Sequence, residues 1–211
     1  MSCVILGGGG HAKVVLDVIR ASGAARVIAV LDRDRSLWGK EMLGVVVRGG
    51  DELLPALVRE GCTGFVVGVG SVGESAPRQR LYTLGLRHAL SPVTCVHPSA
   101  VVSPDAAIGR GTVLAPLCVV NAGARVGDNV IVNTGAIVEH DCLVEDHAHV
   151  ATGAQLAGAV RVGRGAHIGA GATVREGLAI GDDAIVGAGA VVVHDVPAGA
   201  VVVGVPARKL R

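Results

Sequence analysis

The sequence predicts a small Rossmann-like α/β domain followed by a solenoid of short β-strands. One aliphatic residue recurs at every sixth position from Val96 to Val192 without interruption. Before Val96 the pattern changes to apolar, strand-like runs that alternate with segments of helical spacing. Phe, Tyr and Trp occur once each among 211 residues, so the core must be narrow and filled by aliphatic side chains.

The N-terminal domain is expected to span residues 1–92 and to contain a parallel sheet flanked by helices. The expected strands are 3–6, 26–31 and 65–69, and the expected helices are 12–21, 51–60 and 77–86. Their alternation along the chain is typical of an α/β fold, in which helices connect parallel strands. The Leu90-Ser91-Pro92 stretch marks the expected domain boundary.

A glycine-rich loop over residues 7–10 follows the first strand and opens the first helix. Residues 7–12 fit the pattern G-x-G-x-x-G/A, with Asp32 about twenty residues later. Main-chain amides at such a helix N-terminus bind phosphate. A nucleotide-diphospho-sugar suits a domain of this size better than a whole dinucleotide, although a tight turn without a ligand is the alternative. The residues expected to bind the nucleotide sugar are Gly9, Gly10, His11, Asp32 and Gly70.

The six-residue repeat is expected to form one domain over residues 93–196, closed by a cap over 197–211. The position four residues after each aliphatic is usually small, and glycine often follows the aliphatic directly, as in Ile108-Gly109. In a solenoid each coil buries its apolar face only against neighbouring coils. The pattern resembles the hexapeptide-repeat transferases, whose fold is a triangular left-handed parallel β-helix. That resemblance implies that three hexads make one coil.

Composition excludes several classes of protein. A formal net charge of +1 predicts neither a nucleic-acid-binding surface nor a membrane-binding patch. No apolar run approaches the ~18 residues that a membrane helix needs, and the short apolar stretch 3–6 has no basic leader of the kind a signal peptide carries. The five cysteines are odd in number and lack C-x-x-C spacing, which favours reduced thiols and a cytoplasmic location.

The tripeptide Glu139-His140-Asp141 is the strongest candidate for a catalytic group. It falls at a corner in the middle of the solenoid, where steps of three hexads place Ala122 below His140 and Gly158 above it. Both neighbours are small, so the imidazole would have open space. Asp141 would orient the imidazole and raise its basicity. An exposed histidine without a function is the alternative.

Two other columns of the solenoid are candidates for binding. One contains His149 with His167 one coil above it, which also suits a polar interruption in a face that packs against another subunit. The second contains Thr152, Ala170 and Ala188 beside glycines. Small residues would let a long ligand such as the pantetheine of coenzyme A reach main-chain amides, although a tight corner also requires small residues. No set of histidines and carboxylates has convincing metal-binding spacing.

The whole chain resembles the sugar O/N-acetyltransferases of the sialic-acid acetyltransferase type. This family includes bacterial enzymes that N-acetylate UDP- or GDP-linked amino sugars. The segments that carry the resemblance are 7–15 (GGGGHAKVV), 133–142 (NTGAIVEHDC), 149–153 (HVATG) and 204–208 (GVPAR). The resemblance implies direct acetyl transfer from acetyl-CoA to a nucleotide-linked amino sugar. It also implies a homotrimer with active sites between subunits, and no metal.

The resemblance also implies roles for individual residues. His140 would be the general base and Asp141 its supporting acid. The residues expected to bind acetyl-CoA are Asn133, His149, Ala170 and Ala188. Gly9, Gly10, His11 and Asp32 match positions that bind the nucleotide sugar. Arg33 stands where some relatives have a second acid, so the identity of the nucleobase stays open.

Three alternative functions remain open at this point. The first is an O-acetyltransferase that acts on a free sugar or sialic acid. The second is a nucleotide-sugar-binding accessory protein without catalysis. The third is a β-helix of the carbonic-anhydrase-like type, which would need three histidines around a metal, a set that His147, His149 and His167 match poorly.

Overall fold

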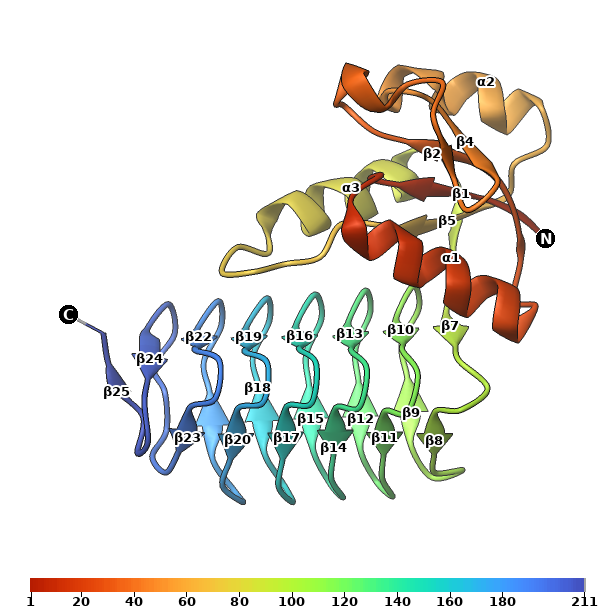
Figure 1. Ribbon diagram of the computed structural model, residues 1–211. Coiled ribbons are helices and arrows are strands. Elements are labelled where there is room, and N and C mark those ends of the chain that lie inside the picture. The colour runs from red at the N-terminus through yellow and green to blue at the C-terminus, as the bar shows by residue number, and fades with distance from the viewer. Residues whose placement is uncertain (211) are drawn as a thin grey trace.

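The computed structural model describes residues 1–210 and consists of an α/β domain lying along one side of a parallel β-helix (Figure 1). The chain passes from the last strand of the first domain, at Pro92, to the first strand of the β-helix, at Cys95. Both predicted architectures are therefore present. Among the described residues, no helix has the length and apolar character needed to cross a bilayer.

The α/β domain is built on a six-stranded sheet with the order β3-β4-β2-β1-β5-β6. Its strands are β1 (Ser2–Leu6), β2 (Arg26–Leu31), β3 (Glu41–Met42), β4 (Val45–Gly49), β5 (Gly64–Val67) and β6 (Ser91–Pro92). Only the β3–β4 pair is antiparallel. The three predicted strands form the centre of the sheet, whereas β3, β4 and β6 were not predicted.

The helices of this domain are α1 (Gly10–Ser22), α2 (Leu54–Arg59) and α3 (Ala76–Arg87), with short 3-10 turns η1 (Arg35–Leu37) and η2 (Asp51–Leu53). Helix α1 begins at Gly10, two residues earlier than predicted, because Gly9 already has the extended backbone of an N-cap. Gly23 ends the helix in the left-handed conformation, with φ of 67°. The helix predicted over 51–60 is divided into η2 and α2.

The β-helix has three sheets of short strands. The domain-facing sheet contains β7 (Cys95–Val96), β10 (Val113–Leu114), β13 (Ile131–Val132), β16 (His149–Val150), β19 (His167–Ile168), β22 (Ile185–Val186), β24 (Val201–Val203) and β25 (Arg208–Lys209). The second sheet contains β8 (Val101–Val102), β11 (Val119–Val120), β14 (Ile137–Val138), β17 (Gln155–Leu156), β20 (Thr173–Val174) and β23 (Val191–Val192). The third contains β9 (Ala107–Ile108), β12 (Arg125–Val126), β15 (Leu143–Val144), β18 (Arg161–Val162) and β21 (Ala179–Ile180).

The predicted register of three hexads per coil is confirmed by the strand pairing. Val113 pairs with Ile131, and Ile131 pairs with His149, so each partner lies three hexads further along the chain. The aliphatic of each hexad points into the interior and is buried in the middle coils. Val96, Val102 and Ile108 are only partly buried, because no coil lies beneath the first one.

The two domains are joined by apolar packing and by a row of polar contacts. Helix α1 lies against the domain-facing sheet, where its buried side chains share one cluster with Cys95 and Val113 (Figure 1). Helix α3 and the residue before it contact one corner of the β-helix. The polar contacts along that corner are Tyr82 Oη to Asp128 Oδ2 (3.0 Å), Arg78 to Asn129 (2.6 and 2.9 Å) and Ser75 Oγ to Asp183 Oδ1 (2.9 Å).

Candidate functional site

His140 and Asp141 form an ion-pair arrangement at the corner between the second and third sheets. The Nδ1 atom of His140 lies 2.9 Å from Asp141 Oδ2, and the two side chains are 62% and 69% exposed. The hydrogen bond that His140 Nδ1 donates to the Asp141 carboxylate raises the pKa of His140 above its ordinary value. Because Nδ1 is held by the carboxylate, Nε2 is the nitrogen available to accept a proton.

Small residues in the adjacent coils make room for this pair. A Cβ atom added at Gly158 would lie 2.5 Å from His140 Nε2, so the imidazole rests directly against that glycine. A Cβ added at Gly123 would lie 2.6 Å from Asp141 Oδ1. The predicted placement of His140 beside Gly158 is confirmed. Asp141 also requires a glycine, Gly123, in the coil before it, and counting coils from His140 alone did not identify that residue.

His149 lies on the domain-facing sheet and is buried beneath the α/β domain. Its Nδ1 atom lies 2.7 Å from the carbonyl oxygen of Ser71, and its Nε2 lies 3.3 Å from Asn133 Nδ2. Burial lowers the pKa of His149 to about 4. Within one chain this column is covered by the chain's own N-terminal domain, since Ser71 contacts His149, and His149 and His167 are only 6% and 8% exposed.

His11 is found in the same region between the domains. Burial, followed by the nearby Arg78 guanidinium, lowers its pKa to about 3. Gly70 lies alongside, since a Cβ added there would be 3.7 Å from His11 Cβ. Gly9 and Gly10 have open space above them. The structure therefore gathers the predicted glycine loop, His11 and Gly70 at one edge of the sheet, and adds Ser71 and Arg78, which were not predicted.

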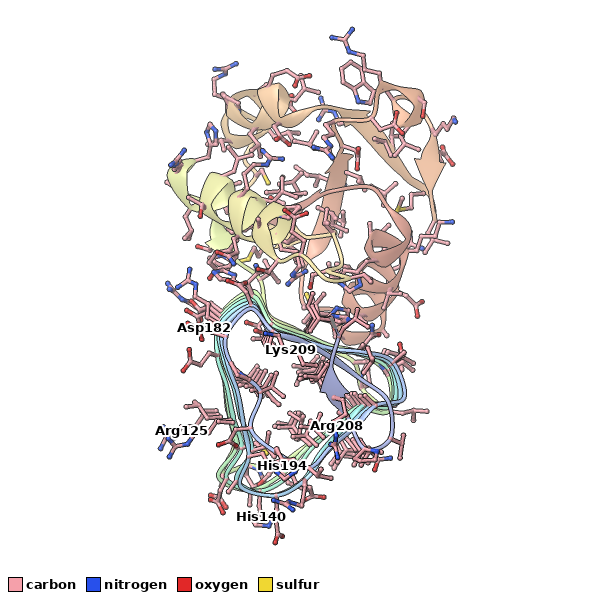
Figure 2. All side chains as sticks on the ribbon, turned by 90° about the vertical axis from the view of Figure 1, so that its left-hand side faces the viewer. Arg125, His140, Asp182, His194, Arg208 and Lys209 are labelled. Carbon is pink, nitrogen blue, oxygen red and sulfur yellow. The ribbon has the colours of Figure 1, made fainter. Side chains whose placement is uncertain are left out.

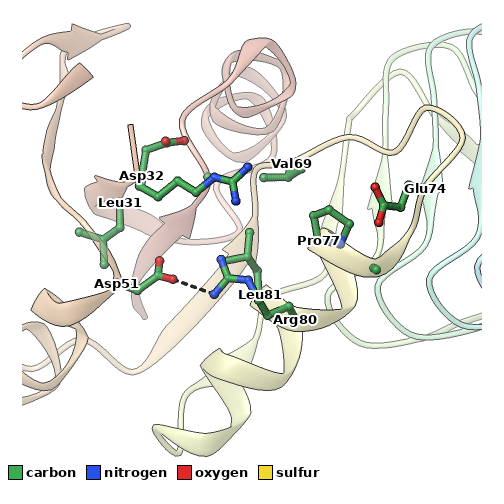
Figure 3. Close-up of a pocket in the computed structure, with 11 residues that line it drawn as sticks. Leu31, Asp32, Asp51, Val69, Glu74, Pro77, Arg80 and Leu81 are labelled. Carbon is green, nitrogen blue, oxygen red and sulfur yellow. Dashed lines mark hydrogen bonds and ion pairs between the residues drawn. The ribbon is translucent and has the colours of Figure 1, made fainter. Parts of the chain in front are cut away.

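Asp32 supports the glycine loop from the end of β2. Its Oδ2 accepts a hydrogen bond from the Gly8 amide at 2.5 Å, and its Oδ1 accepts one from the Asp34 amide at 2.7 Å. A cavity of about 380 Å³ opens beside it (Figure 3). The residues that line this cavity are Gly7, Leu31, Asp32, Arg33, Asp51, Val69, Glu74, Ala76, Pro77, Arg80 and Leu81.

Thr152, Ala170 and Ala188 stack on an exposed edge of the β-helix, as their spacing of three hexads predicted. The amide of Gly171 donates to the Thr152 carbonyl at 2.9 Å, and the amide of Gly189 donates to the Ala170 carbonyl at 2.8 Å. The glycines beside this column, Gly153, Gly171 and Gly189, have φ of 65–66° and open space above them. In these three coils the edge therefore exposes only small residues at the Thr152 and Gly153 columns.

Within one chain these features form two separate groups. His140 lies at the corner of the β-helix farthest from the α/β domain (Figure 2). Asn133, His149, His11 and Gly70 belong to the side of the β-helix that faces the α/β domain. A single chain therefore does not bring its predicted base to its predicted nucleotide-binding loop. Across residues 1–210, no three His, Cys, Asp or Glu side chains gather as metal ligands would.

Comparison with known protein families matches both domains. The family described as the PglD N-terminal domain matches residues 2–83, and the bacterial transferase hexapeptide family matches residues 159–194. A curated relative, UDP-N-acetylbacillosamine N-acetyltransferase of Bacillus subtilis, is 39% identical over 115 residues. That match covers 52% of this chain and 49% of the relative, so it spans about half the relative's length.

Solved structures match over the full chain. PerB from Caulobacter crescentus, in complex with CoA and GDP-perosamine, is 42% identical, with a TM-score of 0.93 over 100% of this chain and 98% of that one. The acetyltransferase domain of PglB from Neisseria gonorrhoeae, in complex with acetyl coenzyme A, is 37% identical, with a TM-score of 0.90 over 99% and 98% of the two chains.

Proposed function

The chain belongs to the hexapeptide-repeat acetyltransferases with a PglD N-terminal domain, and on that premise we propose that it transfers the acetyl group of acetyl-CoA to the amino group of a nucleotide-linked amino sugar. The observation that carries this proposal is the exposed His140–Asp141 pair resting against Gly158. The matching relatives, named as N-acetyltransferases or bound to CoA and GDP-perosamine, support the choice of both substrates.

In the proposed reaction His140 is the general base. The acceptor nitrogen forms the new bond to the acetyl carbonyl carbon while neutral His140 accepts its proton at Nε2. The carbon–sulfur bond then breaks and coenzyme A leaves as the thiolate. Asp141 keeps its hydrogen bond to Nδ1 throughout and stabilises the imidazolium that forms. No acyl-enzyme is required, because the acceptor attacks the thioester directly.

The exposed column Thr152, Ala170 and Ala188 is proposed to hold the pantetheine arm of acetyl-CoA. Its support is the open space above the neighbouring glycines, which lets a narrow, extended chain approach the main chain. Asn133 and His149 are proposed to act at the acetyl end of the same substrate. Gly9, Gly10, His11 and Asp32 are proposed to hold the nucleotide sugar, whose diphosphate suits the N-terminus of α1.

Replacement of His140 tests the proposed chemistry. His140→Ala should lower kcat by roughly 10²- to 10⁴-fold in a thiol-release assay with acetyl-CoA and a nucleotide-linked amino sugar. His194→Ala is a matched control, because His194 lies in the same column three coils further along and is followed by Asp195, whose Oδ1 accepts from the Ala179 amide. Near-normal turnover of His140→Ala would rule out the proposed base.

We further propose a homotrimer in which His140 of one subunit faces the nucleotide-binding edge of a neighbour. The support is the separation of these groups within one chain (Figure 2) and two outward aliphatics near the first coils, Val101 in the second sheet and Leu117 at the corner before that sheet. Val101 and Leu117 are 62% and 66% exposed, which is unusual for large aliphatics that have no partner surface.

Co-expression of two inactive chains tests the shared site. His140→Ala and Asp32→Ala chains should each be inactive alone. In mixed trimers about a quarter of the sites would pair an intact His140 with an intact Asp32 of a neighbour, so activity should return. Activity that stays at background in verified mixed trimers would place both residues in one chain's site.

A cytoplasmic location is also proposed, supported by five buried free cysteines.

A further inference from the structure

The cavity beside Asp32 lies where a base-recognition site is expected in an α/β domain. The neighbouring strands β1 and β5 continue into helices on opposite faces of the sheet, α1 on one face and α3 on the other. Ligands of open α/β sheets bind in the crevice at such a switch point. Gly7 follows β1 and Val69 follows β5, and both line the cavity.

The walls of this cavity are apolar on one side. Leu31, Val69, Pro77 and Leu81 contribute aliphatic surface from β2, the loop after β5 and α3 (Figure 3). A flat aromatic base buries well against such walls, whereas the charged diphosphate does not. Apart from Gly7 and Ala76, the remaining lining residues are charged, and two of these charged side chains form an ion pair.

That pair is Asp51, at the start of η2, and Arg80, on α3. Arg80 Nη1 lies 2.9 Å from Asp51 Oδ2, and Figure 3 marks this contact with a dashed line. The side chains are 28% and 54% exposed, so both retain polar atoms that a ligand can reach. Because Arg80 contacts Oδ2, the pair presents three polar groups in a row. The two acceptors, Asp51 Oδ1 and Oδ2, are followed by a donor, the Arg80 guanidinium.

We propose that Asp51 and Arg80 read the edge of a guanine base, so that the acceptor substrate is a GDP-linked amino sugar. Guanine presents N2–H, N1–H and O6 along its Watson–Crick edge, which is two donors followed by an acceptor. The two Asp51 oxygens accept from N2–H and N1–H, and the adjacent guanidinium donates to O6. This inference rests on the proposed function and specifies its nucleotide.

The other bases do not match all three groups. Uracil presents an acceptor, a donor and an acceptor, so one of its carbonyl oxygens would face a carboxylate oxygen. Cytosine has an acceptor, N3, in the middle of its edge, so in either orientation this atom would face the acceptor Asp51 Oδ2. Adenine has no oxygen for the guanidinium and no N–H at N1. Buried or half-buried polar groups left without partners reject such analogues strongly.

An exchange of hydrogen-bond donors tests the proposal. Xanthine carries a carbonyl oxygen at the position of the guanine N2 amine, and Asp51→Asn supplies an amide donor opposite it. Binding of GDP, XDP and UDP to the full chain is measured by calorimetry. The unaltered protein should prefer GDP, and Asp51→Asn should weaken GDP and strengthen XDP by roughly 10- to 100-fold each. Glu60→Gln, which breaks the exposed Arg48–Glu60 pair in the same domain, is the control and should change neither affinity.

The outcomes separate this inference from the proposed function. Inverted preference between GDP and XDP in Asp51→Asn, with an unchanged melting temperature, supports guanine recognition. Equal binding of UDP and GDP, or equal weakening of GDP and XDP by Asp51→Asn, overturns it while the proposed acetyl transfer stands. Failure of the unaltered protein to bind any nucleoside diphosphate overturns the proposed function together with this inference.

Discussion

The Nδ1 atom of His149 lies 2.7 Å from the main-chain carbonyl oxygen of Ser71, and this contact joins the β-helix to the loop after β5. A carbonyl oxygen only accepts hydrogen bonds, so Nδ1 carries the proton of the neutral imidazole. Nε2 is then an acceptor, and Asn133 Nδ2 donates to it at 3.3 Å. Ser71 therefore determines which nitrogen of His149 faces Asn133.

The buried state of His149 predicts a loss of stability in acid. Its pKa falls from 6.5 in the unfolded chain to about 4 in the fold. Between these values the unfolded chain binds more protons, so stability is present above pH 6.5 and is lost as pH falls toward 4, by up to about 3 kcal/mol. Urea unfolding across this range should show a shallower pH slope for His149→Gln. The exposed His194→Gln should keep the original slope, and an unchanged slope for His149→Gln would contradict the prediction.

The His140–Asp141 hydrogen bond predicts a shift in the pH dependence of the rate. Only neutral His140 accepts a proton, so kcat/KM should fall as pH drops below its pKa. Asp141→Asn removes the main cause that raises this pKa, so the acidic limb should move to lower pH. Its plateau should fall less than that of His140→Ala. Thiol release measured against pH, with Asp195→Asn as control, checks this. An acidic limb that stays in place would show that another group controls it.

The contact between Gly158 and His140 predicts an effect on the rate with little effect on stability. An alanine Cβ at position 158 would lie 2.5 Å from Nε2, so the exposed imidazole must move away. Gly158→Ala should therefore lower kcat by about tenfold or more, because a displaced base loses its alignment. The denaturation midpoint should hardly change, since an exposed side chain moves at little cost. Unaltered kcat in a correctly folded variant would argue against a role for Nε2.

Arg78 is predicted to stabilise the junction of the two domains. Its side chain is fully buried and donates to the Val69 carbonyl at 2.6 Å and to Asn129, while burial lowers its pKa to about 9. Arg78→Met leaves these buried acceptors without donors and should reduce the free energy of unfolding by about 2–5 kcal/mol. Arg48→Met breaks an exposed ion pair and should leave the denaturation midpoint nearly unchanged. Similar small effects from both variants would contradict the role given to Arg78.

The β-helix was predictable because its period is carried by every coil. The Val, Ile or Leu of each hexad follows from local spacing, whereas the three hexads per coil, which the strand pairing confirms, and the left-handed sense came from the resemblance. Strand β4 was not predicted, because Val45 to Val47 is a short apolar run between Gly44 and Arg48. Such a run cannot be distinguished from a loop without knowing that β2 lies beside it.

Part of the candidate site was predictable from the sequence and part was not. His140 and Asp141 are sequence neighbours and Gly158 lies one coil away, so the motif and the coil length implied by the resemblance were enough to identify all three. Ser71 and Arg78 contact the β-helix through a domain packing that no local pattern encodes. Arginine is also a residue that is rarely buried completely, so nothing in the sequence of α3 indicated that Arg78 would be. The burial of His149 also results from the packing of the two domains.

The polar contacts of α3 limit how the β-helix can change in length. Asn129 and Asp183 lie three coils apart, and they contact Arg78 and Ser75. Removing or inserting a coil between Asn129 and Asp183 would move one of these residues relative to the other by a strand spacing of about 4.8 Å. Arg78 and Ser75 would keep their spacing at the start of α3, so one of the two contacts would no longer align. A coil added after Asp183 would leave both contacts in place. Natural or engineered variants of this chain should therefore gain coils near the C-terminal end, and keep the number between the two contacts constant.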